Sequence, residues 1–435
     1  MLKGKTVAPL TLGCKVNQYE TDGMIELLKE AGMTAVSFEE KADVYLINTC
    51  SVTNMADKKS RQMIHRAKKL NPDAVVIAAG CYVQAAKDKL MEDDRISIII
   101  GNNKKKDIVQ ILEDYLEIGV TDEGMLDIAA EEEPLTINSA LEHTRAYVKI
   151  QDGCNQFCSY CIIPYVRGRI RSRELASITE EVERLAQTGV KEIVLTGIHI
   201  SSYGKDKENE VGLADVIDAI SKIESIERIR LGSLEPGIIT DTFIDRIVDN
   251  KKVCPHFHLS LQSGCNTVLK RMNRKYTCEE YFEKCEMLRK AFDRPALTTD
   301  VIVGFPGETD EEFQETVDYL TKLNLYEMHI FKFSPRQGTV AAGMRDQIGP
   351  EIKNQRSDVL LALSEKNKHA YEASFRGEIL EVLTEEKVRR NGKDGYRGHT
   401  ERYIDIFVEE ECMHRICGRE VDIINHIVQI PYGME

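Results

Sequence analysis

The sequence QDGCNQFCSYC, residues 151–161, places three cysteines within eight residues, with three residues and then two between them. A CxxxCxxC spacing is compatible with structural zinc, with an iron–sulfur site and with coincidence. Zinc normally takes four protein ligands, and no fourth cysteine or histidine lies close by in the chain. Three ligands suit a 4Fe–4S cluster that leaves one iron open to a substrate. The spacing therefore favours an iron–sulfur site, and Tyr160 beside the third cysteine offers a face on which a purine can stack.

Length and composition indicate a multidomain cytoplasmic protein. The chain has 435 residues, too many for one ordinary core, and 42% of them are hydrophobic. No apolar run approaches the ~20 residues of a membrane span, and the N-terminus lacks the apolar core of a signal peptide. We therefore expect no membrane contact and a reducing environment, in which the twelve cysteines are free, catalytic or metal-bound. The net charge of −14 argues against a protein that coats nucleic acid, although a local basic stripe can still bind RNA.

The order of apolar and helical patterns predicts an α/β multidomain fold. In residues 1–118 apolar strands alternate with helices, which indicates a mostly parallel sheet covered by helices. Residues 119–143 lose this periodicity and become acidic, as is typical of a linker. Residues 372–435 contain β-rich segments separated by turns, which predicts a small C-terminal β-barrel.

Residues 144–368 repeat a unit of helix, apolar strand and polar or glycine-bearing strand end. About six such units predict a partial (β/α)6 barrel of the TIM type, whose chemistry lies at the carboxyl ends of the strands. The polar residues that close the predicted strands are Thr196, Glu235, Gln262, Asp300 and Ser334. Ordinary loop capping is the alternative explanation for each of them.

A cysteine triad on the loop after the first barrel strand resembles the radical S-adenosylmethionine (SAM) superfamily, over roughly Arg145–Lys368. The resemblance implies that Cys154, Cys158 and Cys161 hold a 4Fe–4S cluster. Its open iron would chelate SAM and reduce it to a 5′-deoxyadenosyl radical. The residues implied to contact SAM are Thr196, Gly197, Glu235, Gln262 and Gly304, the last of these in the turn VIVGFPGE.

A second set of three cysteines shares one position in the pattern. Cys14, Cys50 and Cys81 each end an apolar strand, in TLGC, INTC and AAGC, and a helix follows each of them. Because the strands of a parallel sheet point the same way, we expect the three thiols to meet at its carboxyl edge. Three thiolates again leave one iron uncovered, which predicts a second, auxiliary 4Fe–4S cluster. Three ordinary buried core cysteines are the alternative.

Two such clusters, one on an α/β domain and one on a radical barrel, resemble the methylthiotransferases across the whole chain. TLGCKVNQYETD, NTCSVTN and KIQDGCNQFCSYCIIPYVRGRIRSR carry the resemblance, and the tail resembles the family's RNA-binding TRAM domain. KIQDGCN and LTGIHISSYG look most like the branch that acts on N6-threonylcarbamoyladenosine (t6A) next to the tRNA anticodon. The branch acting on isopentenyladenosine and the branch modifying a ribosomal-protein aspartate remain alternatives.

This resemblance implies an enzyme whose partners are tRNA, SAM and an electron donor of the flavodoxin or ferredoxin type, and which acts as a monomer. One SAM methylates a sulfur atom on the auxiliary cluster, and a second yields the radical that removes hydrogen from C2 of the adenine. The methylthio group then moves to that carbon. The sequence accordingly shows no Ser-His-Asp or paired-carboxylate arrangement. A zinc-stabilised RNA-binding protein without catalysis is the alternative from another class.

Two basic segments are candidates for RNA contact. The helix expected after Cys50 carries Lys58, Lys59, Arg61, Arg66 and Lys69, and the tail carries Lys387, Arg389, Arg390, Lys393 and Arg397. A solvated helix is the alternative for the first segment, and an excess of acids over bases in the tail weakens the second. The remaining cysteines are expected to be packing residues, with a zinc site at Cys412, His414 and Cys417 as the alternative.

Arginines recur at every second position in RGRIRSR, at Arg167, Arg169, Arg171 and Arg173. In an extended chain this period places all four side chains on one face, which then needs an anionic partner. The protein's own acids are one such partner, and tRNA phosphates with the threonyl carboxylate are the other. The planar guanidinium suits both anions, so we hypothesise that Arg169 or Arg171 reads the carboxylate while its neighbours hold phosphate.

Overall fold

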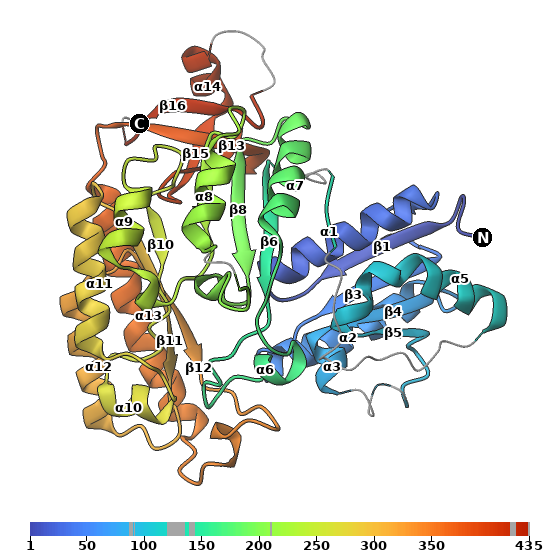
Figure 1. Cartoon of the computed structure of the whole chain (residues 1–435), viewed down its shortest axis with the longest axis horizontal. Coiled ribbons are helices and arrows are strands. Elements are labelled where there is room, and N and C mark those ends of the chain that lie inside the picture. The colour runs from blue at the N-terminus through green and yellow to red at the C-terminus, as the bar shows by residue number, and fades with distance from the viewer. Residues whose placement is uncertain are drawn as a thin grey trace.

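The computed structural model of the chain describes residues 1–86, 90, 92–119, 135–138, 144–208, 211–417 and 423–433. Figure 1 shows a first parallel sheet beside a barrel of parallel strands, with a small antiparallel sheet at the end of the chain. The expected linker, residues 119–143, lies mostly outside the described residues. Among the helices of the described residues, none combines the length and the apolar character needed to cross a membrane.

The N-terminal sheet is parallel throughout, as predicted, with the strand order β2-β1-β3-β4-β5. Its strands are β1 (Thr6–Thr11), β2 (Thr34–Ala35), β3 (Val44–Thr49), β4 (Val75–Gly80) and β5 (Ile98–Ile100). Every residue of β3 is buried, as expected for a central strand covered on both faces. The connecting helices are α1 (Lys15–Glu30), α2 (Asn54–Leu70), α3 (Cys81–Ala85), the 3-10 helix η1 (Asn102–Asp107) and α5 (Ile108–Ile118).

Six parallel strands form the predicted partial barrel. They are β6 (Arg145–Asp152), β8 (Glu192–Gly197), β9 (Arg228–Leu231), β10 (His256–His258), β11 (Ala296–Val303) and β12 (Glu327–Lys332). Isolated parallel bridges from Ile229 to Val253 and from Leu234 to Leu259 join the group β6-β8-β9 to the group β10-β11-β12. A short strand, β7 (Arg171–Ser172), pairs antiparallel with the end of β6.

Helices cover the outer face of this barrel. The helices of this part of the chain are α6 (Ile163–Val166), α7 (Leu175–Gln187), α8 (Leu213–Ser221), α9 (Asp241–Ile247), α10 (Asn266–Arg271), α11 (Cys278–Ala291), α12 (Asp310–Leu323) and α13 (Pro350–Ala373), with the 3-10 helices η2 (Ile200–Ser202), η3 (Pro236–Ile238) and η4 (Ala341–Gly343). The short α6 is not on the outer face and packs against α3 of the first sheet's domain. Thr277 and Thr309 start α11 and α12 with capping boxes, in which each threonine side chain accepts from a helix amide.

The tail forms a four-stranded antiparallel sheet in the order β15-β14-β13-β16. Its elements are β13 (Ile379–Arg390), β14 (Lys393–Thr400), β15 (Asp405–Glu409), α14 (Glu410–Cys417) and β16 (Ile427–Pro431). Asn391 and Gly392 connect β13 to β14 with φ of +51° and +82°. Two residues with positive φ are what a tight hairpin requires, and asparagine followed by glycine supplies them. The β-rich tail was therefore predicted correctly.

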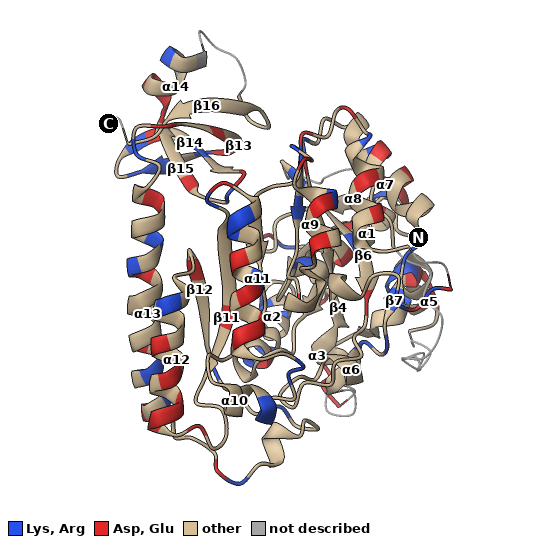
Figure 2. Ribbon diagram, turned by 60° about the vertical axis from the view of Figure 1, so that its left-hand side comes forward, with Lys and Arg blue, Asp and Glu red and all other residues tan. Residues whose placement is uncertain are grey.

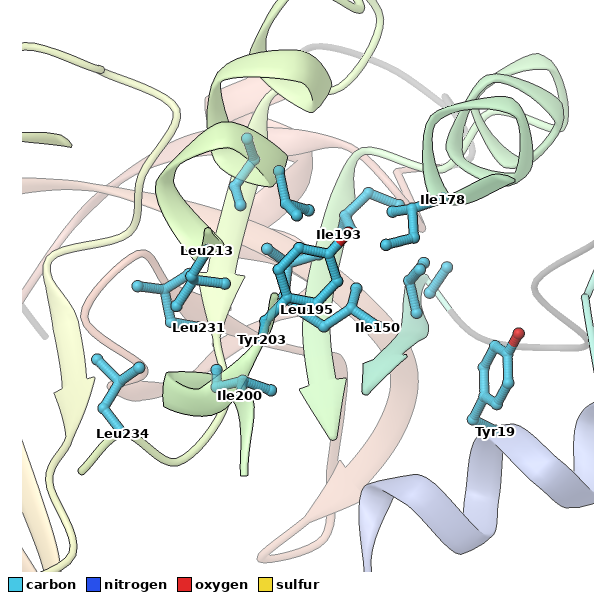
Figure 3. Packing of buried hydrophobic residues seen from close by; sticks show 14 of the residues in the cluster. Tyr19, Ile150, Ile178, Ile193, Leu195, Ile200, Tyr203, Leu213, Leu231 and Leu234 are labelled. Atoms are coloured by element: carbon cyan, nitrogen blue, oxygen red, sulfur yellow. The ribbon is translucent and has the colours of Figure 1, made fainter. Parts of the chain in front are cut away.

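One hydrophobic core runs from the first sheet into the barrel. Val7 and Leu46 of the first sheet belong to the same buried cluster as Ile150, Leu195 and Leu231 of the barrel strands. Figure 3 shows barrel-strand side chains packed against residues of α7 and α8, with Tyr19 of α1 at the edge of the cluster. Because the core is shared, the first sheet and the barrel are parts of one packed body.

A buried ion-pair network lies at the amino-terminal end of the barrel strands. The carboxylate of Glu192 accepts from Nε of Arg230 at 2.7 Å, and nitrogens of Arg145 and Arg228 lie 3.9 Å from it. Burial opposes ionisation of Glu192, but Arg230 and the other two arginines outweigh it and lower the pKa of that carboxyl to about 2. The carboxylate is therefore charged at neutral pH, and Glu385 and Glu401 supply further acids beside Arg145 and Arg228.

Tyr403, in the loop between β14 and β15, covers this network from the tail. Its ring stacks on His256 and His399, with centroid distances of 5.4 and 4.5 Å. The guanidinium groups of Arg145 and Arg230 lie 5.1 and 4.8 Å from the ring centroid. Burial, with Arg145 second, lowers the pKa of His399 to about 4, so its ring is neutral when it stacks. We call this group of residues the barrel floor.

Truncation of Tyr403 tests whether the tail stabilises the barrel. We expect Tyr403→Ala to lower the apparent free energy of unfolding by about 3 kcal/mol, since two stacked rings and two cation–π contacts are lost together. Urea unfolding followed by circular dichroism measures this value. Tyr165→Ala, at a side chain that is 47% exposed, is the matched control, with an expected change below about 1 kcal/mol. Equal losses in the two variants would contradict a stabilising role for Tyr403.

Candidate functional site

The loop that carries the first cysteine triad starts at a position that only glycine fits. Gly153 directly follows β6 with φ of +68°, and a Cβ there would lie 1.8 Å from the carbonyl oxygen of Arg169. The amide of Cys154 then donates to the carbonyl of Gly168 at 3.0 Å. These contacts hold the loop at the carboxyl end of β6, where barrel enzymes place their chemistry.

Cys154, Cys158 and Cys161 come together in this loop as free thiols. Burial, together with the neighbouring Cys158 and Cys154, raises the pKa of Cys161 to about 12. Nη1 of Arg274 donates to Sγ of Cys158 at 3.2 Å. Three adjacent thiols beside a buried arginine have the donor chemistry of a cluster site.

Glu235 ties the end of β9 to the triad loop. Its carboxylate accepts from Nε2 of Gln156 at 2.7 Å and from Nε2 of His199 at 2.5 Å. Nη2 of Arg274 lies 3.3 Å from the other carboxylate oxygen. Gln156, His199, Glu235 and Tyr276 contribute to the lining of a cavity of about 680 Å³. That volume lies in the range typical of small-molecule sites.

Thr196 and Gly197, which the resemblance assigns to SAM, end β8 on the same side of the barrel. Thr196 is buried. A Cβ at Gly197 would lie 2.9 Å from the carbonyl oxygen of Gln151, so the two strand ends approach too closely for a side chain. The glycine therefore brings backbone, and not a side chain, to this part of the site.

Gln262 and Gly304 occupy the corresponding ends of β10 and β11. Gln262 has φ of +79°, an unusual value for a residue with a side chain, and forms a parallel bridge with Val301. Such backbone strain gathers at functional sites. Gly304 has φ of +68°, and a Cβ there would lie 2.3 Å from Cγ of Lys353. The residues predicted to contact SAM thus lie on one rim of the barrel together with the first triad. Their contact with SAM stays a prediction.

Three other expected positions have surroundings that the sequence did not indicate. Asp300 was expected to close its strand, but it lies within β11. Ser334 does follow β12, and its hydroxyl accepts from the amide of Asn54 in the first sheet's domain. Tyr160 packs against a cluster that includes Phe305 and Phe333, so part of its ring is covered by protein.

The second triad also converges, at the carboxyl edge of the first sheet. Cys14 precedes α1, Cys50 directly follows β3, and Cys81 is the first residue of α3 after β4. A Cβ at Gly13 would lie 2.8 Å from Sγ of Cys50, so the chain beside Cys14 runs directly over that sulfur. Burial raises the pKa of Cys50 to about 11, and the charges of Cys81 and Cys14 add to the shift.

The spacing of the sulfur atoms suits a cluster better than a single ion. All six cysteines are described residues, and in the described part of the chain only His258, Asp300 and His329 bring three potential ligand atoms within 4.8 Å of one another. Tetrahedral zinc, with Zn–S bonds of about 2.3 Å, would hold sulfur atoms about 3.8 Å apart. A 4Fe–4S cluster binds each cysteine through a different iron and therefore spreads the sulfurs farther. The two triads therefore lack the close spacing of a single-ion site, and three thiols in each match the donor set of a 4Fe–4S cluster with one open iron.

A fully buried arginine links the second triad to the barrel. Nε of Arg167 donates to Sγ of Cys81 at 3.2 Å. Nη1 donates to Glu20 of α1 at 2.8 Å and to Asp152 of β6 at 2.9 Å, and Nη2 donates to Asn17 at 2.9 Å. Hydrogen bonds to ligand sulfurs shift the reduction potential of iron–sulfur clusters. Arg167 is therefore positioned to tune the second site, as Arg274 is at the first.

Glu20 is the acidic centre of this network. Besides Arg167, it pairs with Lys149 of β6 at 2.9 Å and with Lys105 of η1. Burial opposes ionisation, but Arg167, Lys105 and Lys149 hold the pKa of Glu20 well below its usual range. Three cations on one buried carboxylate connect α1, η1, β6 and the loop after α6.

The four arginines of RGRIRSR do not share one face, and that expectation was wrong. It assumed an extended chain throughout, whereas only Arg171–Ser172 forms a strand. Arg167 ends α6, and Gly168 follows it with φ of +75°. Arg173 is buried and pairs with Glu181 at 2.6 Å. The protein's own acids are the partners of Arg167 and Arg173, which removes both from an exposed RNA-binding face.

The other two arginines remain accessible. The guanidinium of Arg169 lies 4.5 Å from the centroid of Phe157. Nη1 of Arg171 donates to the carbonyl of Arg167 at 2.7 Å, and its side chain is 26% exposed. The prediction that these arginines contact the substrate therefore applies to Arg169 and Arg171 and no longer to Arg167 and Arg173.

Sequence reasoning missed Arg274, His199 and Glu20 as members of the site. Their partners are distant in the chain: Arg274 is 116 residues from Cys158, and Glu20 is 147 residues from Arg167. His199 lies in the quoted LTGIH segment but meets Glu235 only across two strand ends, 36 residues apart. No local spacing marks such pairs, so the fold was needed to find them.

Comparisons with known proteins agree with this architecture. Residues 148–320 match the radical SAM superfamily, and residues 6–101 match a family described as uncharacterized protein family UPF0004. The threonylcarbamoyladenosine tRNA methylthiotransferase MtaB of Bacillus subtilis (strain 168) is 42% identical, over 98% of this chain and 93% of its own length. MtaB of Aquifex aeolicus (strain VF5) is 40% identical, over 92% of this chain and 96% of its own.

One relative whose name gives a different substrate and one solved structure are also similar to this chain. A tRNA-2-methylthio-N(6)-dimethylallyladenosine synthase of Thermoanaerobacter pseudethanolicus (strain ATCC 33223 / 39E) is 36% identical, over 94% of this chain and 89% of its own length. The radical SAM methyltransferase TsrM from Kitasatospora setae, with cobalamin and a [4Fe-4S] cluster bound, has a TM-score of 0.58 at 15% identity. The match covers 78% of this chain and 77% of TsrM, and it supports the α/β fold.

Replacement of Arg167 tests the link between the second triad and the barrel. We expect Arg167→Ala to lower the apparent free energy of unfolding by about 3 kcal/mol, because it removes one cation shared by the buried Glu20 and Asp152 and leaves a cavity where the side chain was. Arg169→Ala, at the accessible neighbour, is the control and should change it by about 0.5 kcal/mol or less. Urea unfolding and iron content per chain are measured for both variants. Matching unfolding curves would show that Arg167 does not join the two parts.

Proposed function

The chain belongs to the radical SAM tRNA methylthiotransferases, and from this membership we propose that it converts t6A in tRNA into its 2-methylthio derivative. The membership confirms the predicted radical SAM enzyme, methylthio transfer, SAM and two 4Fe–4S clusters. One observation carries the proposal: two cysteine triads open on strand ends of one packed body, joined through Arg167. Two relatives named for t6A are 42% and 40% identical to this chain, against 36% for the dimethylallyl relative, which supports the choice of base.

When bound, the two clusters and SAM supply the electron, the radical and the methylthio group. Cys154, Cys158 and Cys161 would hold one cluster, and Cys14, Cys50 and Cys81 the other. Arg274 and Arg167 each donate one hydrogen bond to a sulfur that would bind iron, and such bonds shift the reduction potential of a cluster. The chain's own part in the reaction is to place these two sites at a fixed separation and to orient substrates between them.

The rim residues would hold SAM. Glu235 is ionised and already oriented by His199, Gln156 and Arg274, so a ribose hydroxyl or the methionyl amine can approach it without rearrangement. Burial opposes the ionisation of Glu235, while His199 and Arg274 favour it and lower its pKa. The bare backbone at Gly197 would allow close approach of the amino acid part. Thr196, Gln262, Gly304 and Tyr160 complete the set assigned to SAM.

Exposed cations near the second triad would contact tRNA phosphates. The side chains of Lys58, Lys59, Arg61 and Lys69 on α2 are exposed, beside Cys50 in the sequence, and Arg66 pairs with Glu39. Arg169 and Arg171 would add contacts from the barrel side. The outer helices are poorer candidates, since Figure 2 shows both signs of charge along α12 and α13.

The tail is expected to contribute less to RNA affinity. Lys387, Lys393 and Arg397 pair with Glu410, Glu409 and Asp405 of the same C-terminal segment. Arg389 lies 3.8 Å from Asp394 on the hairpin. Contact through this hairpin would require tRNA phosphates to compete with those carboxylates.

Several finer points belong to the same proposal. The electron donor would be of the flavodoxin or ferredoxin type, the enzyme would be a monomer, and it would act in the cytoplasm. The domain limits at residues 1–118, 144–368 and 372–435 remain predictions.

The alternative zinc site at Cys412, His414 and Cys417 involves side chains outside those described. The other alternative, a zinc-stabilised RNA-binding protein, is disfavoured because neither triad brings its three sulfurs as close together as a single ion requires.

Loss of the gene should remove one modified nucleoside. We expect tRNA from a deletion strain to lack 2-methylthio-t6A and to accumulate t6A, as measured by mass spectrometry of digested tRNA. The same strain carrying the wild-type gene is the control. Loss of the methylthio-isopentenyl product, or of a methylthio group on a ribosomal-protein aspartate, would assign the enzyme to another branch. Unchanged 2-methylthio-t6A would defeat the proposal.

Single cysteine replacements should separate the two triads. Cys158→Ala should abolish 5′-deoxyadenosine formation, whereas Cys50→Ala should keep SAM cleavage and abolish methylthio transfer. Each variant should retain about four of about eight irons per chain, because only one cluster loses a ligand. Cys412→Ala, at a cysteine outside both triads, is the control. Product formation by Cys50→Ala would show that the second triad is not the sulfur-donating site.

A further inference from the structure

The segment around the first triad carries two aromatic rings and an arginine in mutual contact. Phe157 directly precedes Cys158, and Tyr165 lies on α6, shortly after Cys161. The centroids of the two rings are 5.7 Å apart, and the ring planes are nearly perpendicular, at 85°. The guanidinium of Arg169 lies over the Phe157 ring, 4.5 Å from its centroid. We call Phe157, Tyr165 and Arg169 the aromatic platform.

The aromatic platform is open to solvent. Tyr165 is 47% exposed, Arg169 is exposed and Phe157 is half-buried. The Tyr165 hydroxyl and the Arg169 guanidinium make no hydrogen bond or ion pair with any residue that the structure describes. Asp152, the acid at the end of β6, is already paired with Arg167 at 2.9 Å. Both polar groups of the platform are therefore available to a ligand.

The backbone holds Phe157 in a conformation that a bulky side chain avoids. Its φ is +50°, in the left-handed region. Nδ2 of Asn273, which itself has φ of +60°, donates to the carbonyl of Phe157 at 2.9 Å and fixes this conformation. Such strain persists only where the surroundings impose it, and it gathers at functional sites. The Phe157 ring is therefore held in place before a substrate arrives.

The aromatic platform lies between the two triads. Phe157 adjoins the first triad through Cys158. Tyr165 is next to Val166 of α6, which belongs to one buried cluster with Cys81 of the second triad. Figure 1 shows α6 where the barrel meets the first sheet. One end of the platform thus adjoins the first triad, and the other lies on the helix that packs against the second.

Exposed rings beside an arginine are typical of surfaces that bind unpaired bases. Bases stack on aromatic side chains with little dependence on sequence, and an arginine holds the adjoining phosphate. An enzyme that acts on a base within a nucleic acid takes that base out of the stack. The neighbouring base then loses a stacking partner, and an exposed ring beside the site can replace it.

We propose that Tyr165 and Phe157 form a stacking platform for the unpaired anticodon-loop base next to the target adenine, with Arg169 on the adjoining phosphate. The Tyr165 ring covers the face that this base exposes when the target leaves the stack, and Phe157 supports Tyr165 edge to face. This assignment rests on the proposed function. It adds a contact that raises affinity for the anticodon loop whatever modification the target base carries.

Anticodon stem-loops that lack one base test the platform. Binding to enzyme with both clusters is measured at fixed salt for an intact t6A stem-loop and for stem-loops without the 5′ neighbour, the 3′ neighbour or the target base. We expect loss of one neighbour to weaken binding to wild-type enzyme about 10-fold. Tyr165→Ala should weaken binding of the intact RNA by a similar factor and should no longer respond to that missing base, because the same contact is lost only once.

Matched variants show whether the ring itself is responsible. Tyr165→Phe keeps the ring and should bind like wild type, because the hydroxyl has no partner among the described residues. Val359→Ala on α13, at a residue that is also 47% exposed, is the control and should change binding by about 2-fold or less. Tyr165→Leu keeps apolar bulk without an aromatic face, and it replaces Tyr165→Ala if that variant loses iron.

Salt dependence separates the arginine from the rings. Arg169→Ala removes one phosphate contact and should reduce the slope of log K against log salt concentration by about 1. Tyr165→Ala removes no charge and should leave this slope unchanged. An unchanged slope in Arg169→Ala would overturn the assignment of Arg169 to phosphate.

Other roles of the same rings give different results. Equal binding by wild type and Tyr165→Ala, or an equal response of both to each missing base, would overturn the platform. So would a response that Tyr165→Ala loses only at the target position, because the ring would then hold the target base itself. Unchanged RNA binding with a loss of SAM cleavage driven by reduced flavodoxin, but not by dithionite, would make the surface a docking site for the electron donor.

Failure of the platform and failure of the proposed function are distinguishable. If wild-type enzyme makes no product from t6A stem-loops, the proposed function fails. If it makes product while Tyr165→Ala keeps full affinity, the platform alone fails.

Discussion

The guanidinium of Arg167 is the contact on which the relation between the two cysteine triads depends. A fully buried arginine is tolerated only where carboxylates and other acceptors satisfy it, and here Glu20, Asp152 and Asn17 do so. The same guanidinium donates to Cys81, so the second triad is fixed to the barrel through a charge that water does not reach. Buried ion pairs of this kind add little net stability, but they disfavour any arrangement in which one partner is missing.

A second charged layer gives the tail a structural role that its composition does not reveal. Glu192 pairs with Arg230 at the amino-terminal end of the barrel, and nitrogens of Arg145 and Arg228 lie 3.9 Å from it. Tyr403 from the tail lies over Arg145 and Arg230. The tail therefore covers the amino-terminal end of the barrel. Its own bases are largely occupied by its own acids, so RNA affinity is better sought around α2 and the strand ends.

The sequence predicted those features that depend on local pattern and strand direction. Cysteines that end parallel strands must emerge at one edge, and the convergence of Cys14, Cys50 and Cys81 follows from that rule alone. The arginine pattern failed because it needed a continuous strand, and Gly168 with its positive φ breaks the extension. Arg274 and Glu20 could not be foreseen, since each depends on contact between segments that are far apart in the chain.

The shared network also affects the order in which the protein can be made. A ribosome synthesises the first sheet long before residue 167, so the nascent chain has Glu20 and Lys105 but neither Arg167 nor Lys149. Glu181 of α7, which accepts a hydrogen bond from the hydroxyl of Tyr19, is likewise synthesised later. The α1 face of the N-terminal sheet therefore lacks these partners until residues 149–181 have been synthesised, and we expect this face to complete its folding only after that point.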